Sequence, residues 1–152
     1  MTAPWAGSAV NAAVGSARDL VGAPRVLTIA PEMRAAVALA LAHARARLAL
    51  PAFDILWVTR LGGHDAQTNF RDGRVEICLN AAADLSPRLA AWLVLHEAQH
   101  AADGAQFCGA KPDAAEDRAN GFAFNVCRQA EEEFLKLDWR PLSRRAREEM
   151  MP

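Results

Sequence analysis

His96, Glu97 and His100 form an HExxH pattern, and the spacing of these residues is itself a chemical argument. On a helix, side chains four residues apart lie on one face, so the two imidazoles can bind one zinc ion. The glutamate between them then points at the open coordination position, where a water molecule would bind. Because zinc lowers the pKa of that water and the glutamate can accept its proton, the motif supplies a nucleophile and its general base.

The residues before the motif predict a helix whose apolar face contains both histidines. Leu89, Trp92 and Leu93 precede His96 and His100 at helical spacing, so we expect the two imidazoles to point inward. Unpaired imidazoles on a buried face are unfavourable, and a bound zinc ion would remove that penalty. The alternative is a surface helix that carries two solvated histidines.

The ends of this helix are also marked in the sequence. Ser86 is a good N-cap, Pro87 is suited to the first helical position, and Gly104 is a typical C-cap. Asp103 lies three residues after His100 and can orient a ligand histidine through the second ring nitrogen. The alternative is that Asp103 is simply a polar helix end.

A catalytic zinc ion keeps three protein ligands, so one ligand must come from outside the motif. Glu116 is the strongest candidate, because it begins the apolar face of a second helix predicted over residues 113–137, and a core-facing carboxylate needs a partner. The alternative is a capping box with Asp113 at the N-cap and Glu116 three residues later. Further candidates for the third ligand are His64, Asp103 and Asp113.

The combination resembles the zincin metallopeptidases of the gluzincin type, in which a glutamate on the next helix completes HExxH. Residues 116–120, with the sequence Glu-Asp-Arg-Ala-Asn, match that second part of the pattern. Residues 73–80 resemble the strand that precedes the active helix in small ImmA/IrrE-type metallopeptidases. The resemblance covers residues 53–134.

This resemblance implies a set of roles. The zinc ligands would be His96, His100 and Glu116, the general base would be Glu97, and Asn120 would support the ligands from behind. The chain departs from the family in having no tyrosine, whereas many zincins stabilise the oxyanion with a tyrosine or a histidine. We therefore expect His64, or an arginine such as Arg71 or Arg118, to contact the oxyanion or the substrate.

Length and composition predict one globular domain. The chain has 152 residues, of which 52% are hydrophobic, enough for a substantial core. We expect residues 1–24, rich in alanine and glycine, to form a flexible arm and residues 25–152 to form the zincin-like domain. The net charge of −1 gives no electrostatic case for binding nucleic acid, and no stretch is suited to spanning a membrane.

Cysteine content favours a cytoplasmic protein. The chain has 3 cysteines, an odd number that argues against a disulfide framework and for a reducing compartment. The first two dozen residues lack a basic segment before an apolar core, so a classical signal peptide is not expected. Export without such a signal is the alternative.

The order of predicted elements indicates an α+β class with a minimal zincin-like fold. We expect a helix at 31–50, strands at 53–60, 67–70 and 74–79, the motif helix, the helix at 113–137 and a short helix after Pro141. Asp72 and Gly73 predict a hairpin turn between the last two strands. The expected arrangement is a small antiparallel sheet beside the motif helix.

The resulting functional hypothesis is a zinc metallopeptidase that acts on a protein or peptide substrate. An extended peptide would pair with an edge strand of the sheet and place its scissile bond near Glu97. No nucleic acid or membrane partner is expected. The alternatives are a binding or regulatory module with a zincin fold and no catalysis, or the protease domain of a delivered toxin or effector.

Overall fold

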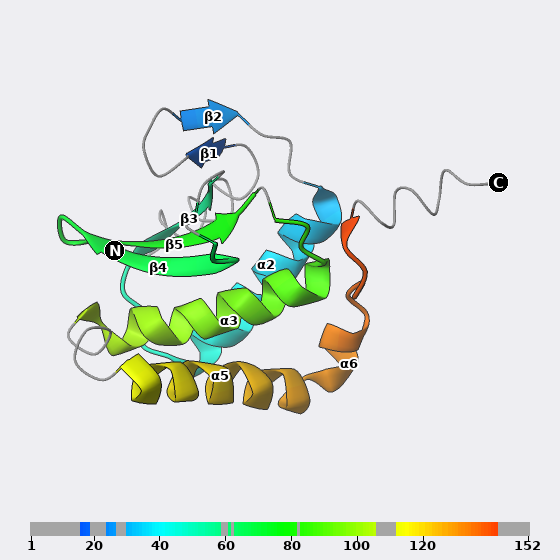
Figure 1. Cartoon of the computed structure of the whole chain (residues 1–152). Coiled ribbons are helices and arrows are strands. Elements are labelled where there is room, and N and C mark those ends of the chain that lie inside the picture. The colour runs from blue at the N-terminus through cyan, green and yellow to red at the C-terminus, as the bar shows by residue number, and fades with distance from the viewer. Residues whose placement is uncertain are drawn as a thin grey trace.

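The computed structural model describes residues 30–58, 61, 63–81, 83–105 and 112–142, together with the backbone of residues 16–18 and 24–26. These residues form an α+β fold, as the sequence predicts (Figure 1). The helices are α2 (Pro31–Arg47), α3 (Pro87–Asp103), α5 (Pro112–Gln129) and α6 (Glu131–Leu135). The strands are β1 (Ser16–Arg18), β2 (Pro24–Val26), β3 (Phe53–Val58), β4 (Ala66–Arg71) and β5 (Arg74–Asn80).

The sheet is mixed, with the strand order β2-β1-β3-β5-β4. β4 and β5 are antiparallel, but β3 and β5 are parallel, so the expected antiparallel sheet is wrong in this respect. The chain passes from β3 to the far side of β5, forms β4 there, and returns through the hairpin to insert β5 between the two. The local turn signal determines only the β4–β5 pairing, because no short-range feature encodes the crossover.

The hairpin turn places β4 at the edge of the sheet. Asp72 and Gly73 have φ values of 52° and 73°, the left-handed conformation that a two-residue hairpin loop requires. Arg71 and Arg74 are opposite each other on either side of this turn. Since β4 is the last strand in the sheet order, one side of its backbone is not paired with another described strand.

The motif helix α3 has the predicted bounds. The Ser86 side chain accepts a hydrogen bond of 3.0 Å from the backbone N–H of Leu89, and Pro87 occupies the first turn. At the other end, Gly104 has a φ of 86° and its N–H donates to the carbonyl of His100. Both ends therefore stop the helix where the sequence indicates.

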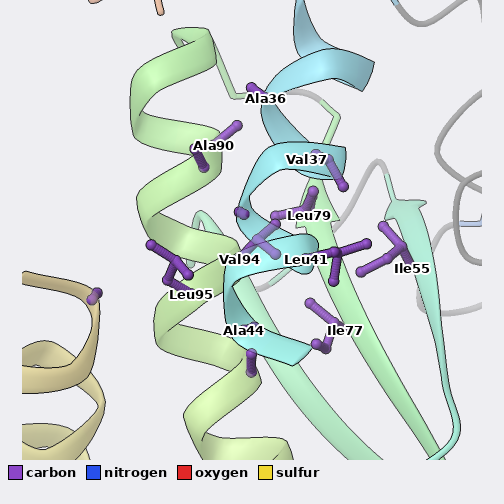
Figure 2. Close-up of a cluster of buried hydrophobic side chains, with 14 of the residues drawn as sticks. Ala36, Val37, Leu41, Ala44, Ile55, Ile77, Leu79, Ala90, Val94 and Leu95 are labelled. Carbon is purple, nitrogen blue, oxygen red and sulfur yellow. The ribbon is translucent and has the colours of Figure 1, made fainter. Parts of the chain in front are cut away.

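α3 is the central helix of the molecule. It lies between the sheet and α5, and it also packs against α2 (Figure 1). Figure 2 shows the buried side chains at the meeting of α2, α3 and the sheet. Residues that are 0–1% exposed come from each of these elements: Val37, Leu41, Ile55, Ile77, Leu79, Val94 and Leu95. Burying each such side chain contributes about 1.5–3 kcal/mol, so α3 is held firmly on several sides.

Other boundaries differ from expectation. The helix predicted over residues 113–137 is interrupted at Ala130 and forms α5 and α6. Ser16–Arg18 and Pro24, which fall in the expected N-terminal arm, belong to β1 and β2, and the rest of residues 1–24 lie outside the described part of the chain. Among the described helices, none is both long enough and apolar enough to cross a membrane.

Candidate metal centre

The three HExxH side chains on α3 point toward the interior of the protein. His96, Glu97 and His100 are 8%, 5% and 6% exposed, which confirms the expected inward orientation of the imidazoles. The apolar face before them is less buried than expected, because Leu89 is 39% exposed. Trp92, one turn before His96, stacks on the His96 ring with a centroid separation of 5.3 Å. The polar side chains of His96, Glu97 and His100 are therefore largely shielded from water.

Glu116 reaches both histidines from near the start of α5. Its Oε1 lies 2.9 Å from His100 Nε2, and its Oε2 lies 3.2 Å from His96 Nε2. The two Nε2 atoms are 3.1 Å apart. Two imidazole nitrogens on α3 and a carboxylate from α5 therefore lie together, and this cluster could hold a metal ion.

The donor set fits a metal ion of the zinc type. Around a tetrahedral zinc ion with ligands at about 2.0–2.1 Å, neighbouring donor atoms lie about 3.3–3.4 Å apart. The two Nε2 atoms are 3.1 Å apart, and one ligand atom from each of the three residues lies within 4.8 Å of the others. Nitrogen and carboxylate oxygen are both ordinary zinc ligands. The Nε2 atoms of both rings face the shared point, and the buried Nδ1 atoms have no hydrogen-bond partner in the described part of the chain.

The route by which Glu116 enters the site differs from the prediction. Its side chain is 56% exposed, so it is not core-facing as expected; the buried residue at this end of α5 is its neighbour Ala115. The alternative capping role is also not observed. α5 begins at Pro112, so Asp113 lies inside the first turn rather than at the N-cap, and the Glu116 carboxylate contacts the histidines instead.

Glu97 lies beside the cluster and is held by a residue of the sheet. Thr68 Oγ1 on β4 lies 3.0 Å from Glu97 Oε1, while Glu97 Oε2 is 3.8 Å from His96 Nε2. Burial raises the pKa of the Glu97 carboxyl above its ordinary value, and the charge of Glu116 acts in the same direction. The charges of His96 and His100 and the Thr68 hydrogen bond oppose this rise. The arrangement favours a carboxyl that can exchange a proton.

These side chains border a cavity of about 560 Å³. Its lining comes from the loop before β4, from β4 itself, and from α3 and α5: Gly63, His64, Asp65, Ala66, Gln67, Thr68, Trp92, Leu93, His96, Glu97, His100, Ala115 and Glu116. His64 is thus brought to the cavity, although it does not join the cluster of metal-ligand type. Arg71 and Arg118 are not among the lining residues, so neither arginine takes the expected position for an oxyanion.

Asp103 does not take the expected role behind a histidine. Its Oδ1 accepts a hydrogen bond of 2.9 Å from Gln99 and lies 3.5 Å from Arg118 Nη1. Because the histidine Nδ1 atoms have no partner among the described residues, Asp103 orients neither ring. Asn120 is half-buried on α5, one turn after Glu116, and is not part of the cavity lining.

Thr68 is the residue that sequence reasoning missed. The alternation of β4 puts its side chain on the face toward α3, but its partner Glu97 lies 29 residues away along the chain. A local pattern could have indicated the strand face, whereas the contact itself has no sequence signal.

Comparisons with protein-family models, curated proteins and solved structures found no match to this chain.

Proposed function

We propose that the protein is a zinc-dependent metallopeptidase that hydrolyses peptide bonds in a protein or peptide substrate. The observation that carries the proposal is the convergence of His96, His100 and Glu116 at 2.9–3.2 Å beside the buried carboxylate of Glu97. A structural zinc site normally has four protein ligands, whereas a catalytic site has three and keeps one position for water or substrate. A cluster of three donors that opens on a cavity favours the catalytic kind.

Each residue has a distinct task in this proposal. His96, His100 and Glu116 hold the ion. A zinc ion bound there supplies a Lewis acid, which lowers the pKa of water and polarises a carbonyl group. Glu97 accepts the proton that the attacking water loses and later delivers it to the leaving amine, so that the proton balance closes over one turnover. Its raised pKa suits a group that must take up and release a proton.

The position of β4 supports an extended peptide as the substrate. β4 is an edge strand, and Ala66, Gln67 and Thr68 line the cavity that contains Glu97. A peptide that pairs with this edge by main-chain hydrogen bonds would pass the metal ligands in extended form. His64, on the loop that leads into β4, is our candidate for contact with the oxyanion or the substrate.

A cytoplasmic location is part of the proposal. Cys78 is buried and Cys127 is half-buried, and both are free thiols in the structure. Free thiols are typical of a reducing compartment.

The decisive experiment compares the parent with Glu97→Gln, each loaded with zinc and incubated with a mixed peptide library. We expect Glu97→Gln to retain about one zinc per chain and to lose cleavage by about a hundredfold or more, because it keeps the side-chain shape but cannot take a proton. Glu133→Gln on α6, where the glutamate pairs with His43, is the matched control and should cleave like the parent. Products are identified by mass spectrometry, with and without a chelator.

Two outcomes would contradict the proposal. Equal cleavage by the parent and Glu97→Gln would remove Glu97 as the base. Zinc binding without cleavage of any library peptide by the parent would favour the alternative, a binding or regulatory module. The missing tyrosine is the sequence feature that would account for that alternative.

A further inference from the structure

Thr68 makes the side-chain hydrogen bond that reaches Glu97 from the sheet. Its Oγ1 lies 3.0 Å from Glu97 Oε1 and 3.1 Å from the Glu97 backbone oxygen. A hydroxyl has one proton to donate, and a bond to a charged carboxylate is stronger than a bond to a neutral carbonyl. The carboxylate oxygen is therefore the favoured acceptor.

The geometry leaves Glu97 with few other restraints. Within the described part of the chain, no other side chain donates a hydrogen bond to this carboxylate; its Oε2 has only the 3.8 Å approach to His96 Nε2. Glutamate has three rotatable side-chain bonds, and its terminal torsion is broad. The Thr68 bond fixes Oε1, which turns Oε2 toward the histidines. Without it, the carboxylate would be free to rotate about that terminal bond.

We propose that Thr68 is a positioning residue for the reaction: its hydroxyl holds the Glu97 carboxylate facing the histidine cluster. The inference rests on the proposed function, since it names the residue that orients the proposed base. Thr68 itself touches neither metal nor reacting atoms in this role.

The backbone of Thr68 has a second relation to the site. Asn80 N–H donates to the carbonyl of Asp65 at 2.9 Å, which marks residues 65 and 80 as a hydrogen-bonded pair of the hairpin. In an antiparallel ladder, hydrogen-bonded residues alternate with residues whose N–H and C=O groups point away from the partner strand. The backbone N–H and C=O groups of Ala66, Thr68 and Phe70 therefore point to the outer edge of β4. The backbone of Thr68 could therefore pair with a bound peptide while its side chain contacts Glu97.

The test compares Thr68→Val, which removes the hydroxyl but nearly keeps the shape, with Thr68→Ser, which keeps the hydroxyl. With zinc-loaded protein and one cleaved library peptide, Thr68→Val should lower kcat by about tenfold to a hundredfold and change KM by less than about twofold. Thr68→Ser should stay within about threefold of the parent. Asn69→Ala is the control, because that side chain bonds Cys78 on the other face of β4 and should leave kcat unchanged.

A readout independent of cleavage comes from crystal structures of the zinc-loaded parent, Thr68→Val and Thr68→Ser. The parent and Thr68→Ser should keep the hydroxyl–carboxylate bond and one Glu97 rotamer, whereas Thr68→Val should show a rotated or multiply placed carboxylate. Zinc affinity should stay within about threefold in all three, because no ligand is altered.

The outcomes separate this inference from the proposed function. If the parent cleaves and Glu97→Gln does not, but Thr68→Val keeps both the parent kcat and the parent rotamer, the positioning role is wrong and the peptidase proposal stands. If the parent cleaves nothing, the peptidase proposal fails, and the Glu97 rotamer in Thr68→Val still decides whether Thr68 orients that carboxylate. If Thr68→Val raised KM but left kcat unchanged, the positioning role would also be wrong.

Discussion

Two clusters in this molecule each pair histidine with glutamate, but they differ in how the ring nitrogens are arranged. On α2, His43 lies against Glu133 of α6, with a separation of 3.0 Å, and its other ring nitrogen lies 2.9 Å from Arg47. On α3, His96 and His100 lie against Glu116 of α5 at similar distances. Each cluster joins helical histidine to a glutamate carried by another helix.

The difference is in how the ring nitrogens are used. Both nitrogens of His43 face protein groups, and Glu133 beside it is 53% exposed. In the α3 cluster, two Nε2 atoms point at the same place and two buried Nδ1 atoms have no partner in the described residues. A complete set of bonds to protein groups is typical of a structural contact, whereas like donors that converge on one point are typical of a metal site.

The comparison is most strongly tested by removing one histidine from each cluster. His100→Ala should weaken zinc binding by more than about a hundredfold, since it removes one of three ligands. His43→Ala should leave zinc affinity within about twofold and lower the free energy of unfolding by about 1 kcal/mol, because it removes partly exposed contacts. Competition with a chromophoric chelator measures the affinity. Equal losses in the two variants would mean that the convergence on α3 has no special role.

The two glutamates give a smaller contrast. Glu116→Gln should weaken zinc binding by about tenfold to a hundredfold, because an amide oxygen is a poorer ligand than a carboxylate. Glu133→Gln should leave it unchanged. Isothermal titration with zinc separates the variants. If Glu116→Gln bound zinc as tightly as the parent, Glu116 would not be the third ligand. His64, which lines the same cavity, would be the next residue to test.

The smallest effect concerns the stability of the metal-free protein. Because burial raises the pKa of Glu97 above its ordinary 4.5, the folded state binds this proton more tightly than the unfolded state. Glu97 therefore contributes stability below about pH 4.5 and loses it as the pH rises through the folded-state pKa. Glu97→Gln should be more stable than the parent at neutral pH, and the gap should close toward acid.

Urea unfolding in the presence of a chelator, from pH 5 to pH 8, measures this gap. The control is Glu132→Gln on the exposed side of α6, whose profile should run parallel to that of the parent. A gap for Glu97→Gln that stays constant with pH would show that the buried carboxyl does not titrate differently in the folded protein.

Much of the local structure could be predicted because the physical causes are local. The N-cap bond of Ser86, the left-handed Gly104 and the Asp72–Gly73 turn each depend on a few adjacent residues. The inward orientation of His96 and His100 follows from their spacing on a helix with an apolar face. These features therefore agree between sequence and structure.

Predictions failed where the cause is not local. The parallel pairing of β3 with β5 depends on a crossover to the far edge of the sheet. Asp103 was expected behind a histidine because of its position in the sequence, yet its side chain pairs with Gln99 and Arg118. Helical spacing gives the face on which a residue lies but not the partner that the next helix offers it.

By itself the sequence determined the chemistry that α3 can offer: two imidazoles and a carboxyl on one inward face, between well-marked helix ends. Tertiary structure decided which other groups meet them. The packing of α5 on α3 brings Glu116 to both Nε2 atoms, and the edge position of β4 brings Thr68 to Glu97. The reason is physical: residue spacing along a helix is fixed by backbone geometry, whereas contacts between elements depend on how the whole core packs.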